Sequence, residues 1–518
     1  MELIKKEIRT SVIGKTVPYQ FVLNDDFNVP DASRDVDRVL TGEGIVRISE
    51  VKRVENYVRV AGTLQFKILC VCSQSAPGLE MLEGSRPFEE MIYTEDEGGE
   101  YVVQPERVDF TPSLVHSRKL GLRAMIELSL HTETSSGEQI TTDVDSGKKL
   151  LKKQRELEPL ELFLGKRDVC RIKEEVQLPG TRENIGTLIW QDVSVAGMDT
   201  RLAQDALLLS GELQVFCIYE SQEGKLDWTE QNVPFESRVE CPGVDETMYH
   251  HVYRSLGDTH VEARMDGDGE MRALGIEAAV DLRILVYREE KLTLLEDVYS
   301  LDEVCRPAVE EKILEELVMQ NHFKNKITEH LDIPELREEI LQICHAWGTL
   351  QTENLEVTEG GIRLEGILHI HFLYIKADDA VPFGVWQGMV PVSCLVESGQ
   401  GGPDMRYDVT CNAEQTSVSL AGSGEVEVKA VLAVQSFFRR PVKTGVITDL
   451  EFTPLDEEAR AKIPGIAGYI VKDGEDLWDL AKRYLTTVDS IREMNGLSSG
   501  EVKPGDKILI FKENTGIL

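Results

Sequence analysis

The sequence predicts a mainly β, multidomain fold in which three tandem β-rich units precede a small βααβ domain. The chain has 518 residues, which is long for one hydrophobic core. Its landmarks repeat with a period of about 150 residues, and each repeat alternates apolar and polar residues as half-buried strands do. We expect units at 1–150, 151–303 and 304–455, each a sandwich or partly closed barrel with a short helix. A linker at 456–468 and a terminal domain at 469–512 complete the chain.

The repeat is visible in the spacing of proline and glycine. A proline follows an apolar residue in each unit, and a glycine lies 32 positions later: Pro30 and Gly62, Pro179 and Gly211, Pro334 and Gly366. Apolar residues recur six, nine and ten positions after each proline, as at Val36, Val39 and Leu40. This spacing predicts a short amphipathic helix that begins at the proline. The glycine is expected to open an apolar strand.

Composition narrows the class of protein. With 41% hydrophobic and 29% charged residues, the chain has the composition of a globular protein. No apolar run approaches the roughly 20 residues that a membrane-spanning helix needs. The first residues carry scattered charges and lack the apolar core of a secretory signal. We therefore expect a cytoplasmic protein without a transmembrane segment.

Charge and cysteine content bear on the partners and on the redox state. A formal charge of −36 argues against nucleic acid as a partner and favours a basic or locally patterned protein. The nine cysteines are widely spread, which is typical of reduced thiols rather than of a secreted disulfide framework. Cys70 and Cys72 point to one face of an expected strand, but no second pair completes a zinc site.

The sequence offers no enzymatic motif, so no catalytic residue, metal or cofactor is expected. Gly14-Lys15-Thr16 ends like a phosphate-binding loop, but position 9 is Arg9 instead of the required glycine. His369 and His371 share one strand face without a third ligand at set spacing and are expected to face solvent. The acidic run at 266–270 lacks the spacing of a calcium loop and predicts a hairpin turn.

The last fifty residues have the clearest pattern. Tyr469 to Lys472 alternate like a short strand, and Gly474 permits a tight turn after it. Helical spacing follows from Leu477 to Tyr484, and a second helix, capped by Thr487 or Asp489, ends near Gly496. A strand at 508–510 closes the unit, and this βααβ segment looks like a LysM module. The polar segment before it is expected to let the module move independently. Trp478 is expected to pack in its core.

The resemblance to LysM modules implies a ligand groove between the loop after the first strand and the loop before the last. The common Gly-Asp-Thr of the family is here Gly474-Glu475-Asp476, so a protein loop and a glycan both remain possible ligands. The extra acidic groups would prefer a basic contact. The implied binding residues are Gly474, Glu475, Asp476, Leu477, Asn495, Leu497, Val502 and Pro504.

The three units, with their proline, their Gly-x-Leu strand and a following Pro-Phe element, resemble the SPOCS repeats of endospore-forming bacteria. With one C-terminal LysM, the layout is similar to that of SipL-type spore coat morphogenetic proteins. That resemblance implies a non-enzymatic scaffold in the mother cell, at the forespore surface, whose LysM domain binds the coat basement-layer ATPase and which meets other coat proteins. A peptidoglycan- or glycan-binding protein of the wall or cortex is the alternative. An enzyme with a site assembled between repeats is a third.

Overall fold

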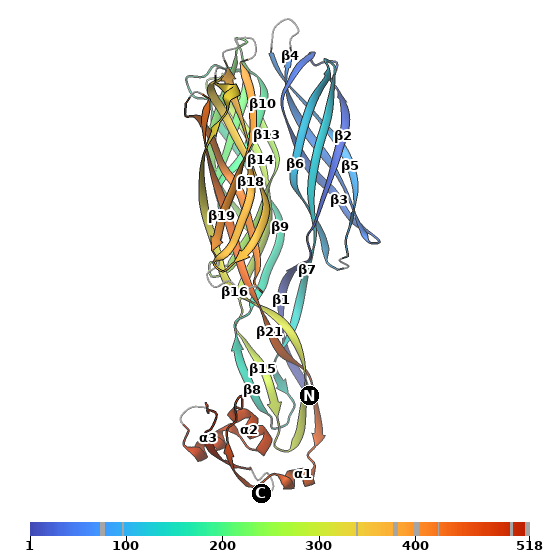
Figure 1. The fold of residues 1–518 in the computed structure, drawn as a ribbon, viewed down its shortest axis with the longest axis vertical. Helices are drawn as coiled ribbons and strands as arrows, with labels where there is room; N and C mark the ends of the chain where they lie inside the picture. Colours follow the sequence, from blue (N-terminus) through green and yellow to red (C-terminus); the bar gives the residue numbers. More distant parts are fainter. Residues whose placement is uncertain are drawn as a thin grey trace.

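The computed structural model describes residues 1–72, 78–95, 98–337, 340–376, 382–397, 404–422, 424–497 and 501–512. The molecule is elongated, with three β units at one end, a stalk of strand ribbons below them, and the C-terminal helices at the foot of the stalk (Figure 1). The sheets are antiparallel, and a βααβ segment ends the chain. The predicted fold class is therefore confirmed.

The first unit consists of two sheets. One has the order β1-β7-β2 with β6 also paired to β7, and the other has the order β3-β4-β5. The strands are β1 (Glu2–Ile13), β2 (Val17–Asn28), β3 (Val36–Val54), β4 (Tyr57–Cys72), β5 (Gly78–Tyr93), β6 (Glu100–His116) and β7 (Lys119–Asp145).

The second and third units repeat this arrangement. The second has sheets β10-β11-β12 and β13-β14-β9, and the third has β17-β18-β19 and β16-β21-β20. In the second unit the strands are β8 (Leu151–Leu157), β9 (Leu160–Gln177), β10 (Ile185–Ala203), β11 (Ala206–Ser221), β12 (Leu226–Glu240), β13 (Tyr249–Met265), β14 (Met271–Glu289) and β15 (Leu292–Tyr299). In the third they are β16 (Glu303–Asp332), β17 (Ile340–Thr358), β18 (Gly361–Lys376), β19 (Phe383–Glu397), β20 (Arg406–Leu420) and β21 (Glu425–Pro454), with a short 3-10 helix, η1 (Pro334–Leu336).

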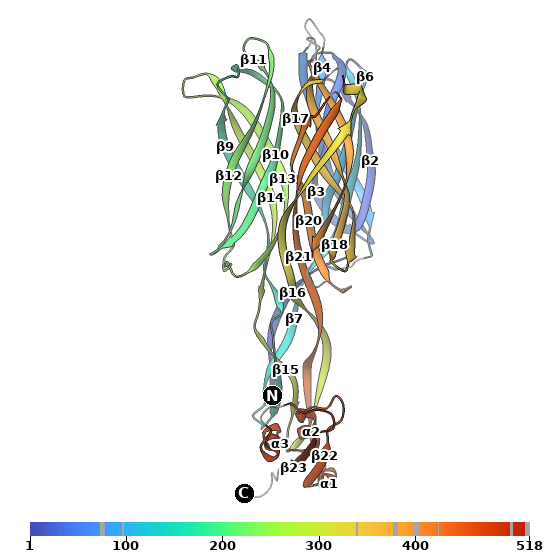
Figure 2. The same cartoon turned by 60° about the vertical axis from the view of Figure 1, so that its left-hand side comes forward.

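The first and last strands of each unit extend beyond its sheets and form the stalk. Three antiparallel ribbons, β1–β7, β8–β15 and β16–β21, run side by side below the units (Figures 1 and 2). Their inward side chains make a narrow core that includes Ile8, Leu294 and Val446. One ribbon from each unit thus reaches the foot of the molecule.

The expected amphipathic helix after each proline is wrong. The same residues begin β3, β10 and β17, and in the described parts of these segments only the three residues of η1 are helical. Each of these strands starts with two register shifts against its neighbour, at Val36/Arg38 and Val39/Thr41 in the first unit. Every bulge adds one residue to a strand and lengthens its local apolar period beyond two. Two closely spaced bulges therefore produced a spacing that imitates a helix.

The glycine that recurs in each unit lies inside a strand instead of opening it. Gly62, Gly211 and Gly366 occupy the interiors of β4, β11 and β18. A third register shift of the neighbouring strand lies opposite each one. At Gly366 an added Cβ would come within 2.4 Å of the Gln351 carbonyl oxygen. The glycine is therefore required by the close approach of the bulged strand.

The three units are packed against one another. Leu69, Ile218 and Leu373, each seven residues after the repeated glycine, are fully buried in a single shared cluster. Equivalent strands therefore meet in an approximately threefold arrangement. The ends of these strands, such as 68–72, lose their polar alternation because both faces are covered.

Candidate functional site

The C-terminal domain is assembled from a two-stranded sheet and two helices. Strand β22 (Ile466–Ile470) pairs with β23 (Lys507–Phe511), and α2 (Leu477–Tyr484) and α3 (Val488–Asn495) lie between them in the chain. The Thr487 hydroxyl accepts a hydrogen bond from the Ser490 amide, 3.1 Å away, and caps α3. A further helix, α1 (Glu457–Lys462), lies within the predicted linker.

The first predicted binding loop contains an internally paired carboxylate. Gly474 has a positive φ of 79°, which favours glycine at this turn. The Glu475 carboxylate accepts a hydrogen bond from the Tyr469 hydroxyl at 2.9 Å and forms an ion pair with Arg483 at 2.9 Å. Desolvation acts to raise the pKa of Glu475, but hydrogen bonds from the Lys472 amide, Tyr469 and Arg483 outweigh it and lower that pKa. Glu475 therefore holds the turn together.

Asp476 and Leu477 also serve the domain itself. The Asp476 carboxylate accepts a hydrogen bond from the Asp479 amide at 2.9 Å, and the reverse bond completes a capping box at the start of α2. Leu477 is buried in the core of the domain. The two predicted binding residues are thus a helix cap and a core residue.

The second predicted binding loop is described only in part, because residues 498–500 lie outside the described residues. Asn495 joins α3 to β23: its side-chain amide donates to the Leu509 carbonyl and its oxygen accepts from the Leu509 amide, both at 2.7 Å. Leu497 and Val502 are half-buried against the core, and Pro504 is exposed. Of these residues, Pro504 is the most accessible to a ligand.

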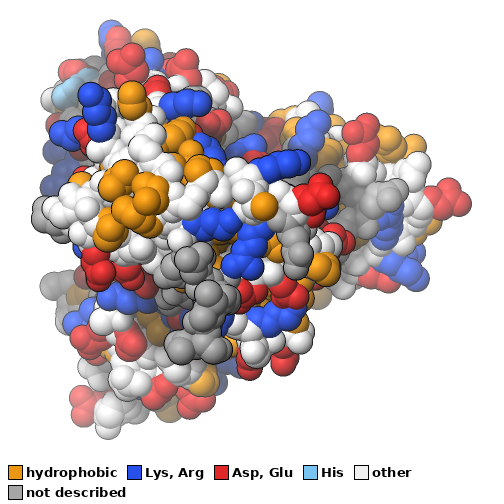
Figure 3. Space-filling view, turned by 90° about the horizontal axis from the view of Figure 1, so that it is seen from below, with side chains coloured by type: hydrophobic (Ala, Val, Ile, Leu, Met, Phe, Trp, Pro, Cys, Tyr) orange, Lys and Arg blue, Asp and Glu red, His pale blue; other side chains and the backbone are white. Residues whose placement is uncertain are grey.

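The sheet of this domain has one free apolar face. Alternation turns Ile508 and Ile510 toward the helices and turns Leu509 outward. On β22, Ile466 and Ile470 are 61% and 59% exposed. Figure 3 shows this end of the molecule from below, where hydrophobic side chains gather at the surface beside Lys and Arg. We call Ile466, Ile470 and Leu509 the apolar face.

The domain docks on the second stalk ribbon, so the prediction that it moves independently is wrong. The Asp297 carboxylate accepts a hydrogen bond from Trp478 Nε1 at 2.8 Å and pairs with Lys482 at 2.7 Å. Lys153, on the paired strand, forms an ion pair with Asp476 at 2.7 Å. These contacts join β8 and β15 to the start and middle of α2.

An aromatic contact completes the docking. The Tyr299 ring lies edge-on to Trp478 with centroids 4.8 Å apart, and its hydroxyl donates a hydrogen bond to the Thr486 carbonyl at 2.8 Å. Trp478 is half-buried in the core cluster of the domain, and Tyr299 belongs to the same cluster. The predicted core role of Trp478 thus holds, although part of its neighbourhood comes from the stalk. We call Lys153, Asp297 and Tyr299 the latch.

Two protein-family models match parts of the chain: one matches the C-terminal domain, and the other matches the second and third units. The LysM domain model matches residues 469–511, and the SipL, SPOCS domain model matches residues 184–264 and 339–421. The chain thus contains SPOCS domain repeats and a C-terminal LysM domain. The SPOCS matches fall in the second and third units, and neither matched family is catalytic. A comparison with curated proteins and with solved structures gave no match.

The latch of the LysM domain was missed by sequence reasoning. Lys153, Asp297 and Tyr299 precede the domain by more than 160 residues, and no local pattern connects them to it. A signal was available in the repeat: Tyr299 ends a stalk strand where the first and third units carry Asp145 and Glu451. An aromatic residue at that place indicates a contact particular to the second unit.

A buried ionic cluster lies where the three β units meet. His345 Nε2 is 2.9 Å from Asp192 Oδ2, and His345 Nδ1 is 2.9 Å from Glu230 Oε1. Carboxylates only accept hydrogen bonds, so both ring nitrogens carry protons and the imidazole is charged. Burial acts to lower the pKa of His345, but the bonds to Asp192 and Glu230 outweigh it and raise that pKa to about 9.

The first unit adds a cation to the same region. Lys67 Nζ pairs with Glu43 at 2.6 Å and donates a hydrogen bond to the Gln191 carbonyl of the second unit at 2.7 Å. His345 stacks on Phe216 of that unit, with ring centroids 4.2 Å apart. The ionic and aromatic contacts therefore join all three units, and each charge has a partner within the protein.

The two histidines considered as metal ligands lie in the same region. His369 bonds to Gln351 at 2.9 Å, and His371 stacks on Trp347 at 5.2 Å. Both are half-buried, so the expectation that they face solvent is wrong. Among the described residues no group of three or more His, Cys, Asp or Glu is arranged to hold a metal ion. The acidic run at 266–270 forms the turn between β13 and β14, as predicted.

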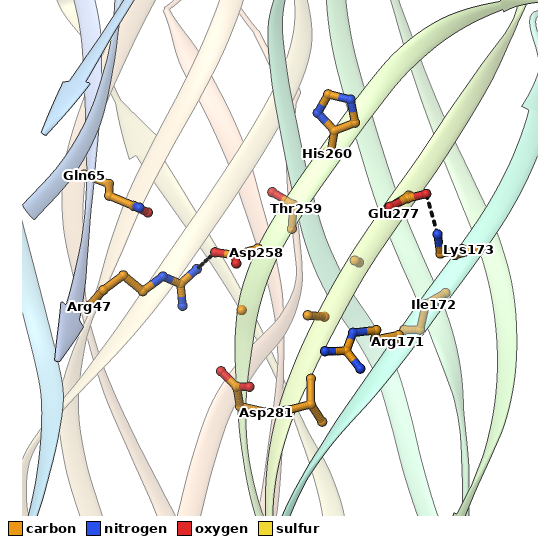
Figure 4. Close-up of a pocket in the computed structure, with 14 residues that line it drawn as sticks. Arg47, Gln65, Arg171, Ile172, Lys173, Asp258, Thr259, His260, Glu277 and Asp281 are labelled. Carbon is orange, nitrogen blue, oxygen red and sulfur yellow. Dashed lines mark hydrogen bonds and ion pairs between the residues drawn. The ribbon is translucent and has the colours of Figure 1, made fainter. Parts of the chain in front are cut away.

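An open cleft of about 570 Å³ lies between the first unit and the second unit (Figure 4). Arg47 crosses it to Asp258 at 3.0 Å, and Lys173 pairs with Glu277 at 2.8 Å. Arg171 and Asp281 also line it. Cations and anions alternate along its walls.

Two further properties concern the helices and the thiols. No helix in the described ranges is long and apolar enough to cross a membrane. All nine cysteines are free thiols, eight of them buried. Burial raises the pKa of Cys217 to about 12, so this thiol is unreactive at neutral pH.

Proposed function

We propose that the protein is a non-enzymatic adaptor of the mother cell that tethers the coat to the forespore surface. Its LysM domain binds the coat basement-layer ATPase, and its SPOCS units provide docking surfaces for other coat proteins. The alternative, a glycan-binding LysM protein of the wall or cortex, would use the groove loops instead.

The apolar face is the observation that carries this proposal. Exposed Ile466, Ile470 and Leu509 on one sheet face resemble the apolar core of a protein interface more than a sugar site built from polar groups. Lys507 lies opposite Ile470 on the same face and forms no ion pair with the described residues. A partner with an apolar patch and a nearby carboxylate fits this surface.

The arrangement of the whole molecule supports the same proposal. The apolar face lies at the foot of the stalk, and the β units lie at the opposite end of the long axis (Figure 1). Two partners can therefore bind at once without touching each other. The carboxylates of Glu475 and Asp476 already have cations within the protein, which disfavours the basic contact that the sequence suggested.

The test is capture of the basement-layer ATPase by the full-length protein. Changing Ile466→Ser and Ile470→Ser together is expected to reduce capture at least tenfold and to abolish encirclement of the forespore. The control is Met389→Ser, which changes an equally exposed strand residue of the third unit. Undiminished capture by the double variant would reject the apolar face as the tether. Retention of the intact protein on insoluble peptidoglycan, without capture of the ATPase, would favour the glycan alternative.

A further inference from the structure

The three stalk ribbons provide an internal comparison for the latch. Asp143, Asp297 and Asp449 are equivalent: each follows a bulge, and each accepts a hydrogen bond from the next backbone amide at 2.8 Å. This part of the latch is therefore a common feature of the ribbons. It does not by itself explain why the LysM domain docks on the second one.

Two other positions distinguish the second ribbon. Lys153 faces Asp297 in register, whereas Ile4 faces Asp143 and Ala308 faces Asp449. Tyr299 is likewise replaced by acidic residues in the other ribbons. Only the second ribbon thus combines a cation for Asp476, an acceptor for Trp478 and an aromatic ring that fills the core of the domain. Its docking face is specific to the LysM domain.

The latch covers one side of the domain and leaves the other free. Lys153 contacts Asp476 in the loop between β22 and α2, and Asp297 contacts α2 one turn further on. An outside ligand that approached this loop would meet the ribbon. The apolar face lies across the sheet from the helices, because its residues alternate with Ile508 and Ile510.

We infer that the stalk ribbon β8–β15 covers the helix side of the LysM domain in place of an outside ligand. It excludes N-acetylglucosamine oligosaccharides from the loop at Asp476 and holds the apolar face outward. The ion pairs of the latch are half-exposed and screened by salt, whereas Tyr299 is buried in the core of the domain. Removing the ion pairs therefore loosens the contact and leaves the core of the domain in place. This inference does not rest on the proposed tether, since it concerns the opposite side of the domain.

The experiment uses the full-length chain with Lys153→Ala and Asp297→Ala combined. The matched control combines Lys152→Ala and Asp143→Ala, which removes an ion pair of 2.5 Å that does not touch the LysM domain. Hydrogen–deuterium exchange of residues 477–486 reports whether the latch opens. Calorimetry with a hexamer of N-acetylglucosamine reports whether opening exposes a sugar site.

The latch variant is expected to exchange residues 477–486 at least threefold faster than the control and to bind the hexamer at least tenfold more tightly. Exchange equal to that of the control would overturn the inference, because the ribbon would not restrain the domain. Faster exchange without a gain in hexamer binding would also overturn it, because the ribbon would not exclude the sugar. Capture of the basement-layer ATPase, measured on the same variant, is expected to be unchanged. A failed tether can therefore be told apart from a failed latch.

Discussion

The contact among the β units and the contact between the stalk and the LysM domain are built from similar groups but differ in burial. At the junction of the units, the charged His345 side chain is only 6% exposed and is stacked on Phe216. In the latch, the side chains of Asp297 and Lys482 are 23% and 35% exposed. Water and salt screen the second contact far more than the first.

This difference assigns separate mechanical roles to the two contacts. Removing one member of a buried ion pair leaves a charge without a partner, which costs several kcal/mol. Removing a member of a half-exposed pair costs little, because water replaces it. The units therefore behave as one body, while the ion pairs of the latch contribute little and its buried part is the Tyr299 side chain.

Replacement at the junction of the units is expected to have the largest effect. His345→Ala removes the cation that is hydrogen-bonded to Asp192 and opens a space beside Phe216, so the free energy of unfolding should fall by about 3 kcal/mol. Glu230 is partly exposed and rehydrates, which limits the loss. Chemical denaturation measures the change. His369→Ala, at a half-buried histidine with a hydrogen bond to Gln351, is the control and should cost about 1 kcal/mol. Equal losses in the two variants would contradict the special role of His345.

The same histidine predicts a dependence of stability on pH. Its pKa is raised from 6.5 to about 9 in the folded protein, mainly by Asp192 and Glu230 acting against burial. The folded state thus binds the proton more tightly than the unfolded chain does. Its contribution is complete below pH 6.5 and is lost as the pH rises through 9. Subtracting the stability of His345→Gln from that of the wild type, between pH 6 and pH 10, isolates this contribution. A difference that stayed constant with pH would refute a charged imidazole.

Features set by local sequence could be predicted, whereas features set by contacts between distant segments could not. The βααβ order follows from local spacing and was predicted, and Thr487 is one of the two residues that cap chemistry offered, with Asp489, for the second helix. The spacing of Val36, Val39 and Leu40 was misread as helical because bulges are set by the neighbouring strand, which lies outside any local window. The latch joins residues far apart in the chain, so no local pattern contained it.

The ligand-binding role of the predicted groove residues stays a prediction, but the structure shows contacts of theirs that the sequence did not reveal. Resemblance to the LysM family placed Glu475, Asp476 and Asn495 at a ligand groove, and their polarity was consistent with that placement. In the structure their polar atoms pair with Arg483, Lys153 and Leu509. Sequence reveals that a side chain is polar, but only the fold reveals whether its hydrogen bonds are already satisfied. The exposed apolar residues of β22 were instead assigned to the linker or to an ordinary strand.

Within the LysM domain, Asn495→Ala is expected to have an intermediate effect. It removes the two bonds to Leu509 and a third to the Ile491 carbonyl at 2.8 Å, so the local free energy of opening should fall by about 1–2 kcal/mol. Hydrogen–deuterium exchange of 507–511 should accelerate, while that of 361–376 should not change. Asn24→Ala, at an exposed position of β2, is the control. Acceleration in both regions would mean that the domain does not open separately.

The smallest effect is expected at Asp476, where two roles can be separated. Asp476→Thr keeps a side-chain oxygen that can cap α2 and removes only the half-exposed ion pair with Lys153, so local stability should change by about 0.5 kcal/mol or less. Asp476→Ala removes the cap as well and should cost about 1 kcal/mol. Exchange of 477–484 in the two variants measures the difference. If the Asp476→Thr variant lost as much local stability as the Asp476→Ala variant, the ion pair with Lys153 would stabilise the domain more than the helix cap does. The latch would then resemble the buried junction of the β units instead of a contact that salt can open.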